Sequence, residues 1–208
     1  MSSYAELTAL SIEALRHRAR LRFRLVEDIP TLLADFACAI ADEIQAANRD
    51  GRPARLILPV GPVKQYPMLV EITNRERISW RNVWVFQMDE FLDWQGRPIP
   101  ESDPLSFTGY LRRELFSRID PDLQMPAGHH VVPHPFRIDE FSDKLAQVGG
   151  ADCCFGGIGY HGHVAFNEPP ISRWHRVTAE QMRQSLTRVV ALGDDSIVVQ
   201  SIHSAGGN

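Results

Sequence analysis

The segment VWVFQMDEF, residues 83–91, decides the fold because it joins an apolar strand to a polar turn that carries two carboxylates. Its first four residues leave no polar face, which is typical of a strand covered by helices on both sides of a parallel sheet. Two other segments share this character, LIL at 56–58 and DCCF at 152–155, and each runs into a loop that contains glycine. Three such segments predict a sheet that is buried on both faces.

Amphipathic segments alternate with these strands. Asp28 and Pro30 predict the start of a helix whose apolar residues return every three or four positions until Gly51 ends it. Shorter helices are expected near Pro67, over about residues 106–116, and around residues 138–148. The alternation predicts a three-layer α/β/α fold with a Rossmann-like, mostly parallel sheet.

The beginning of the chain has a different pattern. Apolar residues recur among charged ones over residues 4–19, which predicts an amphipathic helix, so residues 1–20 are interpreted as a helical extension. Residues 21–25 read LRFRL, an alternation that predicts a half-buried strand. That strand is expected to open a single α/β domain over residues 21–208.

Composition excludes several classes of partner. The 208 residues are 44% hydrophobic and 23% charged, with a net charge of -4 and no run of like charges, so neither nucleic acid nor an anionic membrane is an expected partner. Three cysteines, two of them adjacent at Cys153 and Cys154, predict reduced core thiols of a cytoplasmic protein rather than a disulfide framework. No signal peptide and no stretch of about 20 apolar residues is evident, and a small ligand is expected.

The chemistry is expected where the loops leave the carboxyl ends of the strands, because open parallel sheets bind ligands there. Three such loops stand out: PVGP at 59–62, MDEF at 88–91, and GGIGYHGHVAFNEPP at 156–170. The third carries His161, His163 and Glu168 among four glycines that permit tight turns. Taken alone, this pattern is also that of a glycine-rich turn with solvated histidines.

The motifs together resemble the glucosamine-6-phosphate deaminase/isomerase family. The resemblance rests on GIG at 157–159, GHVAFNEP at 162–169, MDEF at 88–91 and SF at 106–107, which follow in the family's order. It covers about residues 21–208, and the chain is expected to lack the family's C-terminal core strands. Lactonases of the same superfamily share the Gly-His step but not Phe-Asn-Glu-Pro, which favours the deaminase branch.

The resemblance implies a role for each matching residue. His163 would move a proton to open the pyranose ring, and Glu168 would orient and charge that imidazole. Asp89 would take the proton from C2 and return it at C1, with Glu90 beside it raising its pKa. His161 is a further candidate catalytic residue. The residues expected to contact the substrate are Gly61, Lys64, Glu90, Gly157, Gly159 and Asn167.

The chain departs from the family pattern at three places. His161 stands where the family has an acid in Asp-Gly-His, and the loop at 60–62 lacks the hydroxyl residues of the family's phosphate-binding turn. An arginine expected near residues 200–203 is absent from QSIH. Lys64 and the amino terminus of the helix that follows are the remaining anion-binding groups expected there.

The leading hypothesis is an aldose–ketose isomerase or deaminase that acts on an amino sugar or a related sugar phosphate without a redox cofactor. Its expected partner is this small molecule, and a homo-oligomer is the assembly considered. One alternative is a non-catalytic sugar-binding or regulatory relative. Another is a metal site in which His161 and His163 are joined by Glu168 or Asp89. The histidines at 129, 130 and 134 are expected on the surface, with His134 nearest to the pocket.

Overall fold

The computed structural model describes residues 4–22, 24–159, 162–168 and 177–204. Four parallel strands form one sheet in the order β3-β2-β1-β4. The strands are β1 (Ala54–Leu58), β2 (Val83–Gln87), β3 (His130–Val131) and β4 (Cys153–Cys154). Strand order proceeds from β1 through β2 to β3 and then returns to place β4 on the other side of β1, so the topological switch point lies between β1 and β4.

Three helices cover one face of the sheet. They are α3 (Ile29–Asp50), α4 (Gln65–Glu76) and α5 (Phe107–Glu114), and their apolar sides share one core with β1 and β2. The predicted start and end of α3 are confirmed: the Asp28 side chain accepts a hydrogen bond from the Thr31 amide, and Gly51 ends the helix with a φ of 66°. Trp80 and Tyr66 are fully buried in this core.

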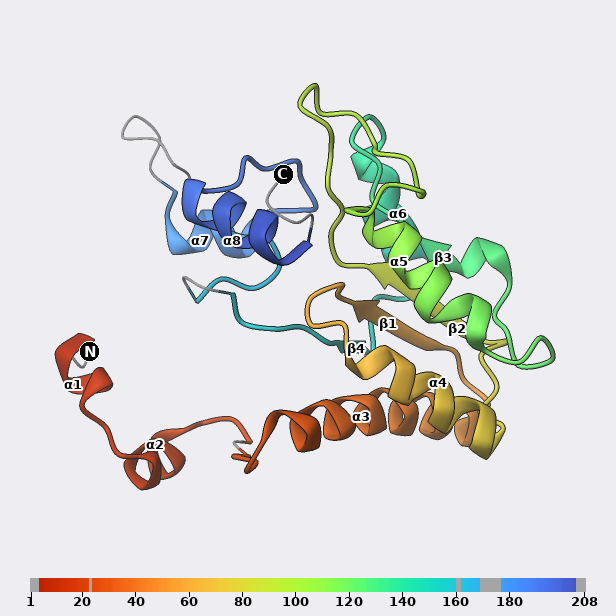
Figure 1. The fold of residues 1–208 in the computed structure, drawn as a ribbon, viewed down its shortest axis with the longest axis horizontal. Coiled ribbons are helices and arrows are strands. Elements are labelled where there is room, and N and C mark those ends of the chain that lie inside the picture. The colour runs from red at the N-terminus through yellow and green to blue at the C-terminus, as the bar shows by residue number, and fades with distance from the viewer. Residues whose placement is uncertain (1–3, 23, 160–161, 169–176, 205–208) are drawn as a thin grey trace.

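A second layer covers the opposite face. Helix α6 (Ile138–Gln147) packs there, with the ring of Phe141 5.5 Å from that of Phe86 in an edge-to-face contact. Figure 1 shows the sheet between α3 and α4 on one side and α6 on the other. The three-layer α/β/α prediction is therefore confirmed. Short 3-10 turns at Phe116–Arg118 and Ala127–His129 complete the connection into β3.

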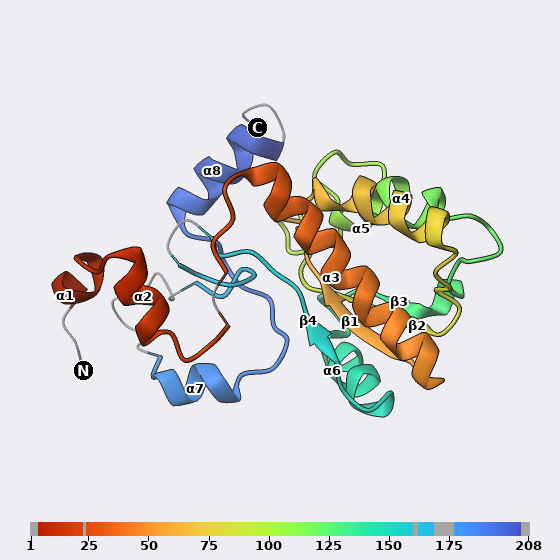
Figure 2. The same ribbon diagram turned by 90° about the horizontal axis from the view of Figure 1, so that it is seen from below.

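The prediction for the first 25 residues was wrong in two respects. The single helix is two short ones, α1 (Tyr4–Thr8) and α2 (Ile12–Arg18), and α2 buries none of its residues. The strand at 21–25 does not form among its described residues, since Leu21 is 84% exposed and no strand pairs with it. An alternating pattern makes a strand only where a neighbour supplies hydrogen bonds, and both views show α1 and α2 away from the sheet (Figures 1 and 2).

The cysteine prediction also needs correction. Cys38, Cys153 and Cys154 are free thiols, but Cys38 and Cys154 are exposed and only Cys153 is partly covered. Cys38 lies on α3 away from its buried side, and for Cys153 and Cys154 the reason is the position of β4, which pairs with β1 alone in the described part of the chain. The predicted burial of that strand on both faces is accordingly wrong.

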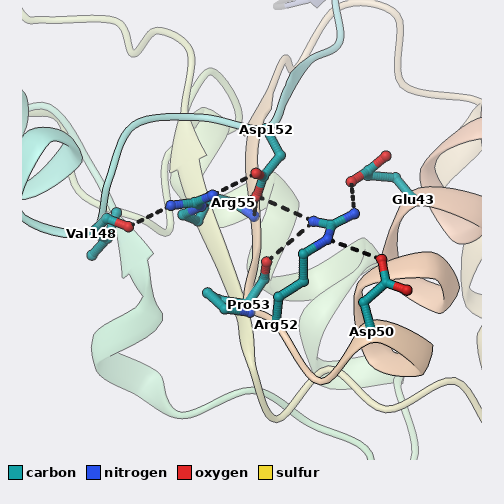
Figure 3. Close-up of polar contacts among 7 residues, drawn as sticks. All are labelled: Glu43, Asp50, Arg52, Pro53, Arg55, Val148 and Asp152. Carbon is teal, nitrogen blue, oxygen red and sulfur yellow. Dashed lines mark hydrogen bonds and ion pairs between the residues drawn. The ribbon is translucent and has the colours of Figure 1, made fainter.

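The chain ends its described part in two helices, α7 (Ala179–Gln184) and α8 (Asp194–Ser204). Figure 1 shows them beyond the carboxyl ends of the strands. At the opposite ends of β1 and β4, the guanidinium of Arg55 donates to both carboxylate oxygens of Asp152, at 2.9 and 2.6 Å (Figure 3). No helix in the described residues is long and apolar enough to cross a membrane.

Candidate active site

The loops that follow β1, β2 and β4 meet at one edge of the sheet. Gly157 packs so closely on the loop after β1 that a Cβ there would lie 3.2 Å from the Cδ of Pro62 and 3.4 Å from the carbonyl oxygen of Gly61. A Cβ at Gly156 would lie 3.2 Å from the Cε of Met88, in the loop after β2. The predicted meeting point therefore exists, and glycine is what permits this approach.

Asp89 is the second residue after β2 and lines a cavity of about 1020 Å³. Burial, together with a smaller contribution from the negative charge of Glu90, raises the pKa of its carboxyl group to about 7. No salt bridge joins Asp89 to a cation among the described residues. A carboxyl group with a pKa near 7 can both accept and return a proton at neutral pH.

Glu90 is held quite differently from its neighbour. Its carboxylate accepts hydrogen bonds from the amides of Phe107 and Thr108, both at 2.8 Å, and lies 2.7 Å from the Thr108 hydroxyl. These groups form the amino terminus of α5, where a negative charge is stabilised. The Glu90 carboxylate oxygens are thus already hydrogen-bonded to this helix, and the expectation that Glu90 contacts substrate stays a prediction.

His163 and Glu168 lie together, as the resemblance implied. The Nδ1 atom of His163 is 3.6 Å from Oε1 of Glu168, and the two side chains are only 10% and 6% exposed. Glu168 also accepts hydrogen bonds from the Gly193 amide at 2.6 Å and from the Ser196 hydroxyl, which ties the loop to the first turn of α8. The imidazole is thereby fixed beside a buried carboxylate.

Gly159 makes room for the His163 ring. A Cβ at residue 159 would lie 2.0 Å from Nε2 of His163, a distance that real side chains do not reach. The Gly159 amide also donates to the carbonyl oxygen of His163 at 2.8 Å, which closes the turn. Gly159 is thus required for the placement of the imidazole, and the expectation that it contacts substrate stays a prediction.

Phe166 brings the His163 loop against the Asp89 loop. Its ring centroid lies 5.3 Å from that of Phe91 and 6.2 Å from that of Phe107. The cavity beside Asp89 is lined by residues 164–167, the segment between His163 and Glu168. The structure therefore places the predicted acid–base residues on adjoining loops, with Asp89 on the cavity wall and the dyad flanking it.

The remaining predicted residues are less closely grouped. Asn167 lines the cavity, whereas Gly61 and Lys64 are exposed in the loop before α4 and do not line it. His161 lies outside the described residues. Within the described part, no group of three or more His, Cys, Asp or Glu side chains could hold a metal ion.

Sequence reasoning missed several polar residues around the site. Arg188 lines the cavity, and its described contacts are with neutral groups: Asn167, Ser185 and Met182. The expectation that His129 and His130 lie on the surface holds only in part, because both are half-buried: His129 stacks on Trp84 with ring centroids 3.8 Å apart, and His130 belongs to β3. His134 lines a separate groove beside α6 rather than the Asp89 cavity. Histidines in a proline-rich segment gave no signal of an edge strand.

Comparison with known proteins agrees with the resemblance. The chain is 31% identical to the glucosamine-6-phosphate deaminase of Caenorhabditis elegans over 181 residues, which cover 83% of this chain and 61% of that protein. It is 30% identical to the enzyme of the same name from Phocaeicola vulgatus over 169 residues, covering 78% and 58% of the two chains. The chain thus spans about three-fifths of the length of these relatives.

Solved structures support the fold. A monomeric glucosamine-6-phosphate deaminase of the NagB superfamily superposes with a TM-score of 0.66 at 24% identity, covering 84% of this chain and 66% of that one. No protein-family model matches the chain. The predicted resemblance to glucosamine-6-phosphate deaminases is confirmed over most of the chain.

Proposed function

We propose that this chain acts on an amino sugar phosphate, glucosamine-6-phosphate or a related sugar, as an aldose–ketose isomerase/deaminase. The reaction would begin with opening of the pyranose ring. A proton would then move from C2 to C1, which converts the open aldose with its C2 amine into a C2 imine. Addition of one water to that imine would break the C–N bond and release ammonia with a ketose phosphate.

The observation that carries the proposal is the state of Asp89. Its carboxyl group lines the cavity, and burial holds its pKa at about 7. Shuttling a proton between adjacent carbons requires one group that is a competent base and, after proton transfer, a competent acid at the same pH. A pKa near the working pH satisfies both requirements.

His163 and Glu168 would serve the ring-opening step. A neutral imidazole can take the proton of the C1 hydroxyl and deliver a proton to the ring oxygen, and the nearby carboxylate stabilises the imidazolium formed in between. The separation of 3.6 Å suits this charge interaction. The contacts of Glu168 with Gly193 and Ser196 keep its position fixed while the imidazole changes charge.

Two cationic side chains are candidates for the phosphate. Lys64 immediately precedes α4, whose amino-terminal amides favour an anion, and Arg188 brings a guanidinium without a described carboxylate partner to the cavity wall. Arg188 lines the cavity and Lys64 does not, so the two side chains mark two alternative positions for the phosphate. Separate Lys64→Met and Arg188→Met variants should raise KM for the phosphorylated sugar unequally, which identifies that end.

The test is exchange of the C2 proton. When the wild-type chain is incubated with glucosamine-6-phosphate in D2O, the sugar should gain deuterium at C2 or C1, which proton NMR detects. With the Asp89→Asn variant it should gain none. Asp152→Asn, the same change at the other end of the sheet, is the matched control and should exchange normally. Sugar binding without exchange in the wild-type chain would favour the non-catalytic relative instead, and equal exchange in wild type and Asp89→Asn would refute the role of Asp89.

A further inference from the structure

A buried polar network lies directly behind Asp89. Gln87, the last residue of β2, is fully buried, and its Nε2 donates to the main-chain carbonyl oxygen of Asp89 at 2.8 Å and lies 3.4 Å from Oε2 of Glu90. On its other side, Oε1 lies 3.0 Å from the Thr108 hydroxyl and 3.2 Å from Nε2 of His130. One amide therefore links β2, β3, α5 and the turn that carries Asp89.

Chemistry fixes the orientation of the Gln87 amide in this network. The carbonyl of Asp89 and the carboxylate of Glu90 can only accept, so the NH2 group of Gln87 must face them. Oε1 then faces His130 and can only accept, which requires the histidine proton on Nε2. Burial, with a smaller contribution from Arg112, lowers the pKa of His130 to about 4, so the imidazole stays neutral and this tautomer persists at neutral pH.

We infer that Gln87 and His130 are positioning residues, which hold the main chain at residue 89 so that the Asp89 carboxyl group stays in the cavity wall. Glu90 is already fastened to α5, and Gln87 fastens the carbonyl of the preceding residue. The turn between β2 and α5 is thus fixed at two successive residues. An apolar side chain at 87 would fill the same space and leave the Asp89 carbonyl without this donor.

The reason for a buried amide here is specificity of position. A strand end covered by helices is ordinarily filled by an apolar side chain, and each buried polar atom needs a partner to avoid a desolvation cost. Among the described residues, the charged or ionisable groups near the Asp89 carboxyl are Glu90 on the same turn and Tyr66 of α4, and Asp93 and Arg188 line the same cavity. His130 is linked to residue 89 through Gln87. No described cation forms a salt bridge with Asp89, so its position in the cavity wall rather than charge pairing keeps this carboxyl group ready to exchange protons.

The inference is tested with Gln87→Met, which keeps the volume and removes all four contacts. We expect kcat for the amino sugar phosphate to fall about 10- to 100-fold with little change in KM, since displaced reacting groups lose rate rather than binding. Carbon-13 NMR of the Asp89 side chain should show its pKa falling from about 7 towards the ordinary value of about 3.9, because a freed turn admits water. This second measurement does not depend on turnover, so it decides the inference even if the proposed function fails.

Two further variants separate positioning from general stability. Thr73→Val removes another buried contact, the 3.2 Å hydrogen bond from the Trp80 indole, and should lower stability without moving the pKa of Asp89. His130→Gln keeps a donor near Nε2 and should preserve that pKa, whereas His130→Phe should lower it. If Gln87→Met does not fold, the pair at His130 decides the question. Unchanged Asp89 titration in Gln87→Met, or in His130→Phe where that pair decides, would overturn the inference.

Discussion

Asp89 and Asp152 lie at opposite ends of the same sheet, beside the two strands that flank β1, and the pKa values of their carboxyl groups are shifted in opposite directions. Asp152 precedes β4 and accepts two hydrogen bonds from the Arg55 guanidinium, which together with the Arg55 amide hold its pKa below the ordinary value (Figure 3). Asp89 follows β2, has no cation as a described partner, and its pKa is raised to about 7.

The difference shows how one residue type serves two purposes in a single sheet. A compensated carboxylate ties strands together and is permanently charged near neutral pH. An uncompensated buried carboxyl group costs stability when it ionises, but it can exchange protons at that pH. The amino end of this sheet therefore carries a stabilising ion pair, and the carboxyl end carries the carboxyl group to which we assign the proposed chemistry, at the end where open parallel sheets usually bind ligands.

The largest expected effect is on turnover. Asp89→Asn should lower kcat by a factor of about 10² to 10⁴, the range for losing a general acid–base group, while Asp152→Asn should change it less than about twofold. Steady-state assays of ammonia release at a temperature where both variants are folded provide the measurement. Comparable losses in the two variants would remove the proposed distinction between the ends of the sheet.

The next effect is the pH dependence of stability. Since the pKa of Asp89 is about 7 in the folded chain and about 3.9 unfolded, the folded state binds the extra proton between these values. That contribution to stability is complete below pH 4 and is lost as pH rises through 7, on the order of 2 to 4 kcal/mol in all. Urea unfolding of wild type and Asp89→Asn from pH 4 to 8 should show the wild type losing stability relative to the variant. A constant difference would contradict the raised pKa.

The sequence predicted the sheet and its loops well, for a physical reason. Apolar strands that are covered on both sides must alternate with amphipathic helices, so the strands at 56–58 and 83–86 and the helix at 138–148 were placed to within a few residues from local pattern. The amino-terminal strand failed because pairing is non-local, and LRFRL at 21–25 contains no information about whether a neighbour exists. Asp28 and Gly51 succeeded because caps act within one turn of the helix.

The site was predicted only as far as motifs extend. Three site residues belong to sequence motifs that can be recognised without a structure: Asp89, His163 and Glu168. Three others were missed because their contacts join segments that are distant in the sequence: Gln87, His130 and Arg188. A polar residue at the end of an apolar strand does indicate a buried hydrogen-bond network, because a buried amide such as that of Gln87 needs hydrogen-bond partners. The identity of those partners depends on the register of β2 with β3, which the sequence pattern does not specify.

A moderate effect is expected at the amino end of the sheet. Arg55→Met should lower the free energy of unfolding by about 1 to 3 kcal/mol at pH 7, because Asp152 would lose its charged hydrogen bonds while only 17% exposed. Because folding lowers the pKa of Asp152, the stabilisation by this ion pair is fully present at pH values above the ordinary pKa of Asp152. It is lost as the pH falls through the pKa of Asp152 in the folded chain. The deficit of the variant should therefore shrink in acid, opposite in direction to the effect at Asp89. An equal deficit at pH 3 and pH 7 would show that the lost packing of Arg55, not its charge, is responsible.

The smallest expected effect is at Arg52, the outer member of the same cluster. Its guanidinium is 36% exposed and is shared among Glu43 at 3.0 Å, Asp50 at 3.4 Å and Asp152 at 3.8 Å, whereas Arg55 binds one carboxylate with two parallel hydrogen bonds (Figure 3). Exposed ion pairs are screened by salt and contribute little, because long side chains must be ordered to form them. Arg52→Gln should therefore produce a barely measurable shift in the urea midpoint at low salt, and the shift should vanish in 0.5 M NaCl, about the ionic strength that shortens the Debye length to a few ångströms. Arg55→Met should keep its deficit in the same salt because its partner is largely covered. If salt removed both deficits alike, the Arg55–Asp152 pair would behave as a surface contact, and the contrast between the two ends of the sheet would rest on Asp89 alone.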